Sequence, residues 1–317
     1  MEQNDLRMVI KVAKMYYELK LKQEEIAIKE NLSKSKVSRL LNKAVEEGYV
    51  RFSVTYPIKS VNELEKEFID VFKLKRVFIA PIIVEDKFLI MKDVCIALAS
   101  DLTRIINEDD VVAISWGNTL NSLSNNLIPI NKKGIKIVQL NGGIAKNVRP
   151  TRSENIITNF AKVYEATGYI LPVPAIVDNK KIADTIMEDS QINFVLNLAI
   201  NARVAIFTVG SVSSESILID AGYFTKDEYE DMKEMGAVGD ICTRYFNIKG
   251  ELIDKDLNGR AIGISLDALK AKDYSIGIGV GIKKANAILG ALRGGYMNSL
   301  YTDEITAKEV LKIYYNL

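Results

Sequence analysis

In the first fifty residues, apolar side chains recur at the spacing of an α-helix in three successive segments. The first segment has its apolar positions at Leu6, Val9, Ile10, Ala13, Tyr16 and Tyr17. A shorter segment begins at Gln23, where early glutamates suit the positive end of a helix dipole, and it turns Ile26 and Ala27 inward. The third forms one apolar stripe from Val37, Leu40, Leu41 and Ala44. We therefore expect three short helices.

The residues around the third helix predict how it begins and ends. Asn31 can adopt the left-handed conformation that ends a helix, and Ser33 is a good N-cap for the next one. Gly48 closes the third helix, and residues 49–56 then alternate in polarity as a half-buried strand does. This order of helices, turn and strand is typical of a winged helix-turn-helix.

Positive charge is concentrated in the same region. The whole chain has a net charge of only +1, but residues 1–56 carry 11 Lys and Arg against 8 Asp and Glu. The second helix of a helix-turn-helix enters the major groove of DNA, where phosphates repel acids and basic or short polar side chains reach the bases. The candidate DNA contacts are Lys34, Ser35, Lys36, Ser38, Arg39 and Lys43. The alternative is a surface helix whose lysines are merely solvated, but the tight turn and the acid-free segment favour DNA.

From residue 76 onward, short apolar runs typical of strands alternate with helical segments. We expect strands at 76–80, 110–115, 134–140, 169–174, 203–210, 261–265, 274–280 and 300–303, and helices at 92–106, 153–166, 190–202 and 283–294. This alternation predicts a mostly parallel sheet covered on both faces. An amphipathic helix near 58–75 is interpreted as a connector. The predicted fold is α/β, with a winged helix-turn-helix domain at 1–56 and a larger Rossmann-like domain at 57–317.

Glycine-rich turns follow four of the expected strands, and ligands of such sheets bind at the carboxyl ends of strands. The turns contain Gly117, Asn118 and Thr119, then Gly142 and Gly143, then Gly210 and Ser211, and finally Gly281 before Lys283 and Lys284. Glycine lets backbone amides approach a ligand, and a helix N-terminus attracts anions. Each glycine-rich sequence alone is explained by the need for a tight turn, but the four together favour a small anion, such as a phosphate, as the ligand. Asp240 could accept a sugar hydroxyl or cap a turn, and the sequence leaves both open.

Several residue types that would indicate other chemistry are missing. The chain has no histidine, so we expect no metal site and no Ser-His-Asp or Cys-His nucleophile. The two cysteines, Cys95 and Cys242, are expected to be buried free thiols. No phosphate-binding P-loop or GxGxxG motif occurs. The lack of a long apolar run or signal peptide predicts a cytoplasmic protein without membrane contact.

Taken in order, six segments make the chain resemble the SorC family of bacterial sugar-binding transcriptional regulators, especially its deoxyribonucleoside-regulator branch. They are YYELKLKQEEIAIKENLSKSKVSRLLNKAVEEGYV, ISWGNTL, VQLNGGI, FTVGSV, GAVGDICTRYFNIKG and KKANAILGALRGGYMNSLYTDEITA. The resemblance implies an effector domain similar to sugar-phosphate isomerases and deaminases. It also implies phosphorylated sugars as effectors, no cofactor, and homodimers or homotetramers on operator DNA, with repression the commoner mode.

The resemblance also implies roles for individual residues. Gly117, Asn118 and Thr119 match the phosphate loop, while Asp240 matches an aspartate near the sugar and Lys284 a late lysine. Two positions depart from the family pattern. Val280 replaces a usual glycine, and Asn141 stands where a lysine could form an imine with an aldehyde sugar. Asn141 can only hydrogen-bond a hydroxyl, so together with Gly142 and Gly143 it is a candidate for non-covalent effector binding.

Two functions remain to be weighed. The first is a transcription regulator, without enzymatic activity, that a phosphorylated sugar controls. The second is a sugar-phosphate isomerase or deaminase with an appended helix-turn-helix, in which Asp240 and Lys284 would form the acid-base pair. Turnover of sugar phosphates by the purified protein would distinguish the enzyme from the regulator.

Overall fold

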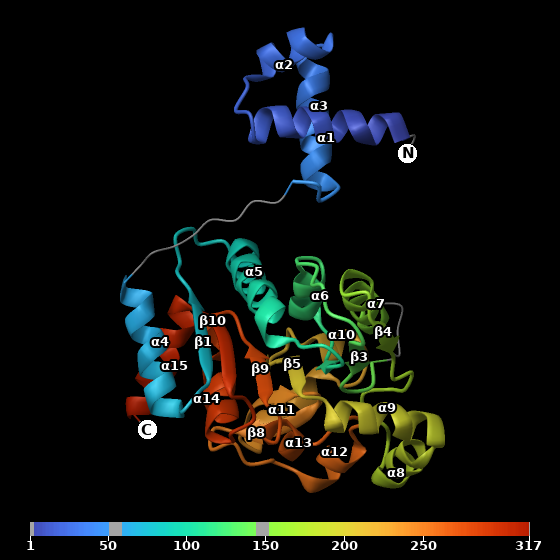
Figure 1. The fold of residues 1–317 in the computed structure, drawn as a ribbon. Coiled ribbons are helices and arrows are strands. Elements are labelled where there is room, and N and C mark those ends of the chain that lie inside the picture. The colour runs from blue at the N-terminus through green and yellow to red at the C-terminus, as the bar shows by residue number, and fades with distance from the viewer. Residues whose placement is uncertain (1–2, 51–58, 144–151, 317) are drawn as a thin grey trace. The chain divides into compact units, whose positions relative to one another are not determined.

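The computed structural model describes residues 3–50, 59–143 and 152–316. The chain divides into two compact units, Met1–Tyr56 and Pro57–Leu317, which are drawn in Figure 1. Each unit has its own hydrophobic core. Within the described ranges, no helix combines the length and the hydropathy that crossing a bilayer requires.

The smaller unit consists of three helices around a small core. They are α1 (Gln3–Tyr17), α2 (Gln23–Glu30) and α3 (Lys34–Glu46). Val12, Ile26, Val37 and Leu41 are buried together where the three helices meet. The predicted end of α2 and the predicted start of α3 are confirmed. Asn31 ends α2 in the left-handed conformation with φ 53°, and the Ser33 hydroxyl accepts a hydrogen bond from the Lys36 amide at 3.2 Å. The strand predicted at 49–56 lies largely outside the described residues.

The larger unit is built on a seven-stranded parallel sheet with the order β1-β10-β9-β5-β2-β3-β4. The strands are β1 (Arg76–Ala80), β2 (Val111–Ile114), β3 (Lys136–Gln139), β4 (Thr167–Tyr169), β5 (Val204–Thr208), β9 (Tyr274–Ile278) and β10 (Ser299–Asp303). Because every pairing is parallel, all carboxyl ends lie at one edge of the sheet. The predicted α/β fold is confirmed.

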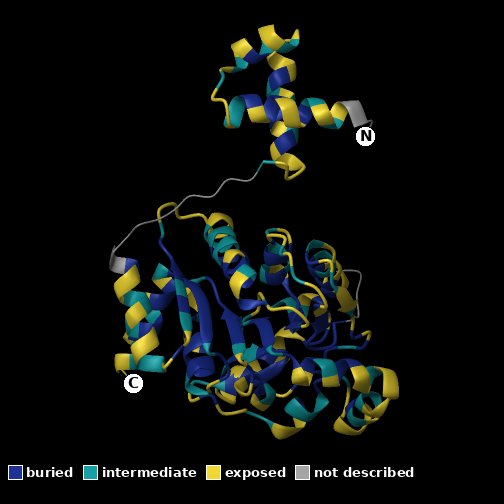
Figure 2. Cartoon of the chain, in the orientation of Figure 1, coloured by how far each residue is buried: buried dark blue, intermediate teal, exposed yellow. Residues whose placement is uncertain are grey.

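Helices cover both faces of this sheet, and its strands are buried in the centre of the unit (Figure 2). One face packs against α5 (Lys87–Ile105), α6 (Asn118–Ser124) and α7 (Ser153–Val163). The other packs against α4 (Lys59–Phe72), α9 (Ser190–Asn201), α14 (Ala285–Arg293) and α15 (Glu304–Asn316). Successive strand residues alternate between the two cores, as Ala205 and Ile206 do.

Some predicted elements are wrong. Residues 59–72 are not a connector, because Phe68 of α4 is fully buried against the sheet. The strand expected at 169–174 ends at Tyr169, and the segment 261–265 forms only isolated bridges, such as Asn141 with Gly263. The remaining helical segments are α8 (Lys180–Glu188), α10 (Ile217–Asp220), α11 (Lys226–Glu234), α12 (Lys255–Arg260), α13 (Leu266–Lys270) and the 3₁₀ turn Ile282–Lys284.

A second, antiparallel sheet was not predicted. It consists of β6 (Gly210–Ser211), β7 (Ala237–Ile241) and β8 (Arg244–Asn247), in that order. The turn between β7 and β8 is Cys242–Thr243, and both residues have positive φ, at 52° and 66°. Two-residue hairpin turns with two positive φ values normally use Asn or Gly, so the sequence carries no turn signal here.

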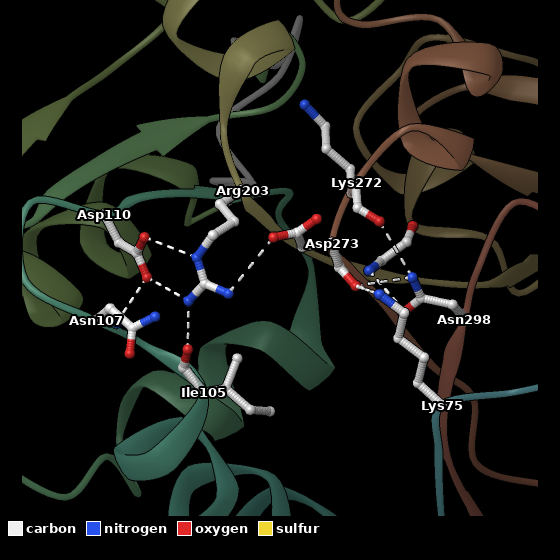
Figure 3. A network of polar contacts seen from close by, with 9 residues as sticks. Lys75, Ile105, Asn107, Asp110, Arg203, Lys272, Asp273 and Asn298 are labelled. Atoms are coloured by element: carbon white, nitrogen blue, oxygen red, sulfur yellow. Dashed lines mark hydrogen bonds and ion pairs between the residues drawn. The ribbon is translucent and has the colours of Figure 1, made fainter.

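Polar contacts close the amino edge of the parallel sheet (Figure 3). The Arg203 Nε donates to Asp110 Oδ1 at 2.8 Å, while Asp110 Oδ2 accepts from the Asn107 amide at 2.7 Å. Beside them, Lys75 Nζ and Asn298 Nδ2 both donate to the Asp273 carbonyl, at 2.7 and 3.0 Å. These contacts connect the residues at the starts of β1, β2, β5, β9 and β10, so hydrogen bonds within the protein hold the amino edge together.

Candidate ligand cavity and nucleic-acid interface

The opposite, carboxyl edge of the sheet contains a cavity of about 450 Å³. This volume is in the range of small-molecule sites, roughly 300–1,000 Å³. Within the sheet, β3 and β4 lie on one side of β2, whereas the strands that follow them in the chain, β5, β9 and β10, lie on its other side. The cavity therefore lies where the direction of winding changes, which is the usual ligand position in open parallel sheets.

Six of the eight predicted effector residues line this cavity, although they are far apart in the sequence. They are Gly117, Asn118, Thr119, Asn141, Asp240 and Lys284. The lining residues that sequence reasoning did not select include Lys87, Trp116, Thr208, Glu215, Cys242 and Thr243. Trp116 follows β2 and Thr208 ends β5, so both could have been found from the rule that ligands bind at the carboxyl ends of strands. Thr243, in contrast, lies in the unpredicted hairpin.

Gly142 and Gly143 do not line the cavity, in contrast to the expectation. The Gly142 amide donates to the Ile262 carbonyl and the Gly143 amide to the Val173 carbonyl, both at 2.9 Å. A Cβ atom at Gly142 would lie 2.1 Å from the Pro174 carbonyl oxygen. Gly142 is therefore needed for close backbone packing, and the amides of both glycines are already bonded within the protein.

Lys284 is a half-buried cation in the cavity wall. Its Nζ donates to the Val209 carbonyl at 2.7 Å. Burial lowers the pKa of Lys284 to about 8, although the nearby Asp240 carboxylate acts in the opposite direction. Within the described ranges Lys284 forms no ion pair, so its charged ammonium is incompletely compensated by the residues of the cavity wall.

Asp240 lies on β7 in the same wall and is also half-buried. Burial raises its pKa to about 6, while the Thr243 amide, which donates to Asp240 Oδ2 at 3.2 Å, acts in the opposite direction. Gly210 of β6 is the direct partner of Asp240, and a Cβ there would lie 2.0 Å from Asp240 Oδ1. Gly210 is thus required because the carboxylate occupies the space of a side chain.

The turn after β2 opens α6. Gly117 has φ 129°, a conformation that side chains rarely adopt, and nothing lies within 4 Å of a Cβ built there. The Cys95 Sγ donates to the Thr119 carbonyl at 3.6 Å and anchors the turn to α5. At Gly281, by contrast, the amide already donates to Asp303 Oδ2 at 2.7 Å.

In the smaller unit, α3 presents the predicted DNA contacts on its outer side. Lys34, Ser35, Lys36 and Arg39 are exposed, and Ser38 and Lys43 are half-buried. One cation is not free, because Lys34 Nζ lies 2.5 Å from Glu24 Oε1 on α2. In the part of the chain that the structure describes, no acidic side chain pairs with Lys36 or Arg39.

Comparison of the sequence with known proteins identifies the family. A family model whose description is "Putative sugar-binding domain" matches residues 56–312. The deoxyribonucleoside regulator of Bacillus subtilis is 33% identical over 98% of this chain and 99% of its own length. The sorbitol operon regulator of Klebsiella pneumoniae is 29% identical, with 98% and 99% covered.

A solved structure extends this likeness to three dimensions. The full-length sorbitol operon regulator SorC from Klebsiella pneumoniae superimposes with a TM-score of 0.73 at 27% identity, covering 98% of this chain and 100% of that one. These relatives are transcriptional or operon regulators, which supports the first of the two functions weighed from the sequence. The chain therefore belongs to the SorC family of sugar-binding transcriptional regulators, and it is a sugar-responsive, DNA-binding regulator.

Proposed function

We propose that the effector is a phosphorylated sugar and that it binds the cavity without a covalent bond. We further propose that the protein is a repressor and that the bound sugar releases it from operator DNA. The observation that carries this proposal is the partly buried Lys284 ammonium, which forms no ion pair within the described ranges, beside the Asp240 carboxylate in one cavity. A phosphate would pair with the ammonium and remove its desolvation cost, while sugar hydroxyls would donate to the carboxylate. Gly117, Asn118 and Thr119 would then supply amides and a hydroxyl to the phosphate.

The operator contacts in this proposal come from α3. Lys36 and Arg39 are exposed and unpaired with acids in the described ranges, so they can reach phosphates or base edges directly. Ser35, Ser38 and Lys43 complete the surface. Lys34 must first leave Glu24, which makes it the weakest of the six candidates.

Ligand control requires two arrangements of the protein with different sugar affinity. We propose a homodimer or homotetramer in which two α3 helices read half-sites about 34 Å apart, so that a small rotation breaks their register. To lower the fraction of protein in the operator-binding arrangement from 99% to 1%, the effector must bind the other arrangement about 10⁴-fold more tightly.

A thermal-shift panel tests the nature of the effector. We expect at least one of ribose 5-phosphate, 2-deoxyribose 5-phosphate, glucose 6-phosphate, fructose 6-phosphate and sorbitol 6-phosphate to raise the melting temperature. At one hundred times Kd the stabilisation should be about 2.7 kcal/mol. Equal stabilisation by the unphosphorylated form of the active sugar would contradict the phosphate part of the proposal, as would no shift with any member of the panel.

The pH dependence of binding provides a second prediction. Above pH 8 the empty protein has lost the Lys284 proton, because its pKa is about 8, and binding an anion must restore that proton. The affinity should therefore fall by up to about tenfold per pH unit above pH 8, where the sugar phosphate itself no longer titrates because its second pKa is about 6. Lys284→Arg keeps the charge, so calorimetry should find a flat profile in this variant. A flat profile in the unsubstituted protein would argue against Lys284 as the phosphate ligand.

A further inference from the structure

Among the residues that the structure describes, two buried polar atoms in the cavity wall have no hydrogen-bond partner. Asn141 and Thr243 are each only 2% exposed, and both line the cavity. Within the described part of the chain, Asn141 Oδ1 and Thr243 Oγ1 accept and donate no hydrogen bond. A buried polar group without a partner costs about 1–3 kcal/mol, so such groups in a cavity indicate that a ligand supplies the missing bond.

The two residues belong to one continuous wall. Arg244, which follows Thr243, donates from Nη2 to the Gly263 carbonyl at 2.9 Å. Gly263 in turn pairs with Asn141 in an antiparallel bridge, and a Cβ at Gly263 would lie 2.6 Å from the Asn141 Cβ. The guanidinium of Arg244 also bonds the Ile264 carbonyl at 2.8 Å, which fixes this segment. Neither Asn141 nor Thr243 is therefore placed by a loosely held loop.

The backbone at Thr243 is in an unfavourable conformation. Its φ is 66°, and a β-branched residue in this left-handed region is a rare and strained arrangement. The strained turn has two consequences in the cavity. It brings the Thr243 amide to Asp240 at 3.2 Å, and it places the Thr243 side chain in the cavity lining beside that carboxylate. Glycine would form the same turn without strain, so the hydroxyl needs another explanation.

We propose that Thr243, together with Asn141, forms a subsite that recognises hydroxyl groups of the sugar and so sets the specificity of this regulator. This inference rests on the cavity being the sugar site. Asn141 Oδ1 can only accept and Thr243 Oγ1 can accept and donate, so a ligand hydroxyl, which carries a proton, can satisfy either atom. A methylene opposite either atom leaves that atom unsatisfied. The subsite therefore favours hydroxylated sugars over their deoxy counterparts.

The variant Thr243→Val tests this inference, because valine has nearly the same shape and the same backbone preference but lacks the hydroxyl. We expect the melting temperature of the empty protein to stay the same or rise, because an unsatisfied group is removed. We expect affinity for the hydroxylated sugar to fall about 5- to 100-fold. Thr243→Ser, which keeps the hydroxyl, should retain most of the affinity.

The chain offers a matched control for the same substitution. Thr302 is 1% exposed, its Oγ1 also has no partner within the described residues, and it does not line the cavity. Thr302→Val should leave or raise the melting temperature in the same way but should not change affinity. Only a residue that contacts the ligand combines unchanged or increased stability of the empty protein with weaker binding.

The affinities are measured by calorimetry with ribose 5-phosphate, 2-deoxyribose 5-phosphate, glucose 6-phosphate and 2-deoxyglucose 6-phosphate, and with the unphosphorylated forms of all four. The inference predicts that the unsubstituted protein prefers the hydroxylated member of at least one pair and that Thr243→Val abolishes this preference. If Thr243→Val binds every member as the unsubstituted protein does, or if no pair is distinguished, the subsite is refuted while the phosphosugar proposal stands. A preference that Thr243→Val abolishes among unphosphorylated sugars alone would support the subsite and refute the phosphate. No binding of any member would refute the subsite, and it would contradict both proposals if no phosphorylated sugar of the thermal-shift panel bound either.

Discussion

Replacing Lys284 with methionine is expected to leave the protein bound to its operator but unable to respond to the effector. Methionine keeps the length and the apolar stem of lysine while removing the charge. The smaller unit, which carries α3, has its own core and does not contain Lys284, so operator affinity should be unchanged. The phosphate loses its cation, and a charge-assisted contact of this kind typically accounts for a large part of anion affinity.

The measurement is release of a labelled DNA fragment from the region upstream of the encoding operon, titrated with the best phosphorylated sugar of the panel. We expect at least a hundredfold higher effector concentration for half release in Lys284→Met. The melting temperature of the empty variant should not fall, because the folded-state pKa of Lys284, about 8, shows that its charged form is disfavoured by burial.

Lys233→Met is the matched control. Lys233 lies on α11 of the same unit and does not line the cavity, and its Nζ pairs with Glu230 Oε1 at 2.6 Å, with both side chains exposed. An exposed ion pair contributes little, so this variant should release DNA at nearly the normal effector concentration. Equal loss of response in both variants, or an unchanged response in Lys284→Met, would remove Lys284 from the proposed phosphate site.

Replacing Arg39 with alanine is expected to weaken operator binding by about 1–3 kcal/mol, which is roughly 5- to 150-fold, if the guanidinium makes two hydrogen bonds to a guanine. Arg39 is exposed on α3, and within the described residues its Nε makes one long hydrogen bond, 3.4 Å, to the Ser35 carbonyl of the same helix. The side chain is therefore available for DNA. Because the guanidinium fork matches guanine and the lysine ammonium does not, Arg39→Lys should not restore full affinity.

Fluorescence anisotropy at fixed salt measures this effect, since affinity for DNA depends steeply on ionic strength. Arg7→Ala serves as a control, because Arg7 is an exposed arginine of the same unit but lies on α1. It should change affinity much less. If both variants bind equally, α3 does not read the operator as proposed.

Much of the fold could be predicted because local signals and the global arrangement agree. In α3, the cap at Ser33, the stop at Asn31 and the apolar stripe of Val37, Leu41 and Ala44 all indicate the same helix. The parallel strands were recognisable because residues buried on both faces form continuous apolar runs. The turn signals after these strands then led to part of the cavity lining, including Gly117, Asn118 and Lys284.

The errors have equally specific causes. Glycine at Gly142 was interpreted as a ligand contact, but the Pro174 carbonyl needs that space, and a sequence does not show which neighbour excludes a side chain. The β7–β8 hairpin was missed because Cys242 and Thr243 are the wrong residues for its turn. Thr243 was missed for the same reason, since it reaches the cavity lining only through this hairpin. The pairing of Lys34 with Glu24 likewise depends on how α2 and α3 pack.

The central claim is that a phosphorylated sugar in the cavity controls the affinity of the protein for DNA. The most direct measurement compares the Kd for the upstream DNA fragment without ligand and with a saturating concentration of the panel member that binds most tightly. We predict that saturation raises this Kd at least tenfold, which corresponds to about 1.4 kcal/mol. If calorimetry shows that the sugar phosphate is bound but the Kd for DNA is unchanged, the account is contradicted.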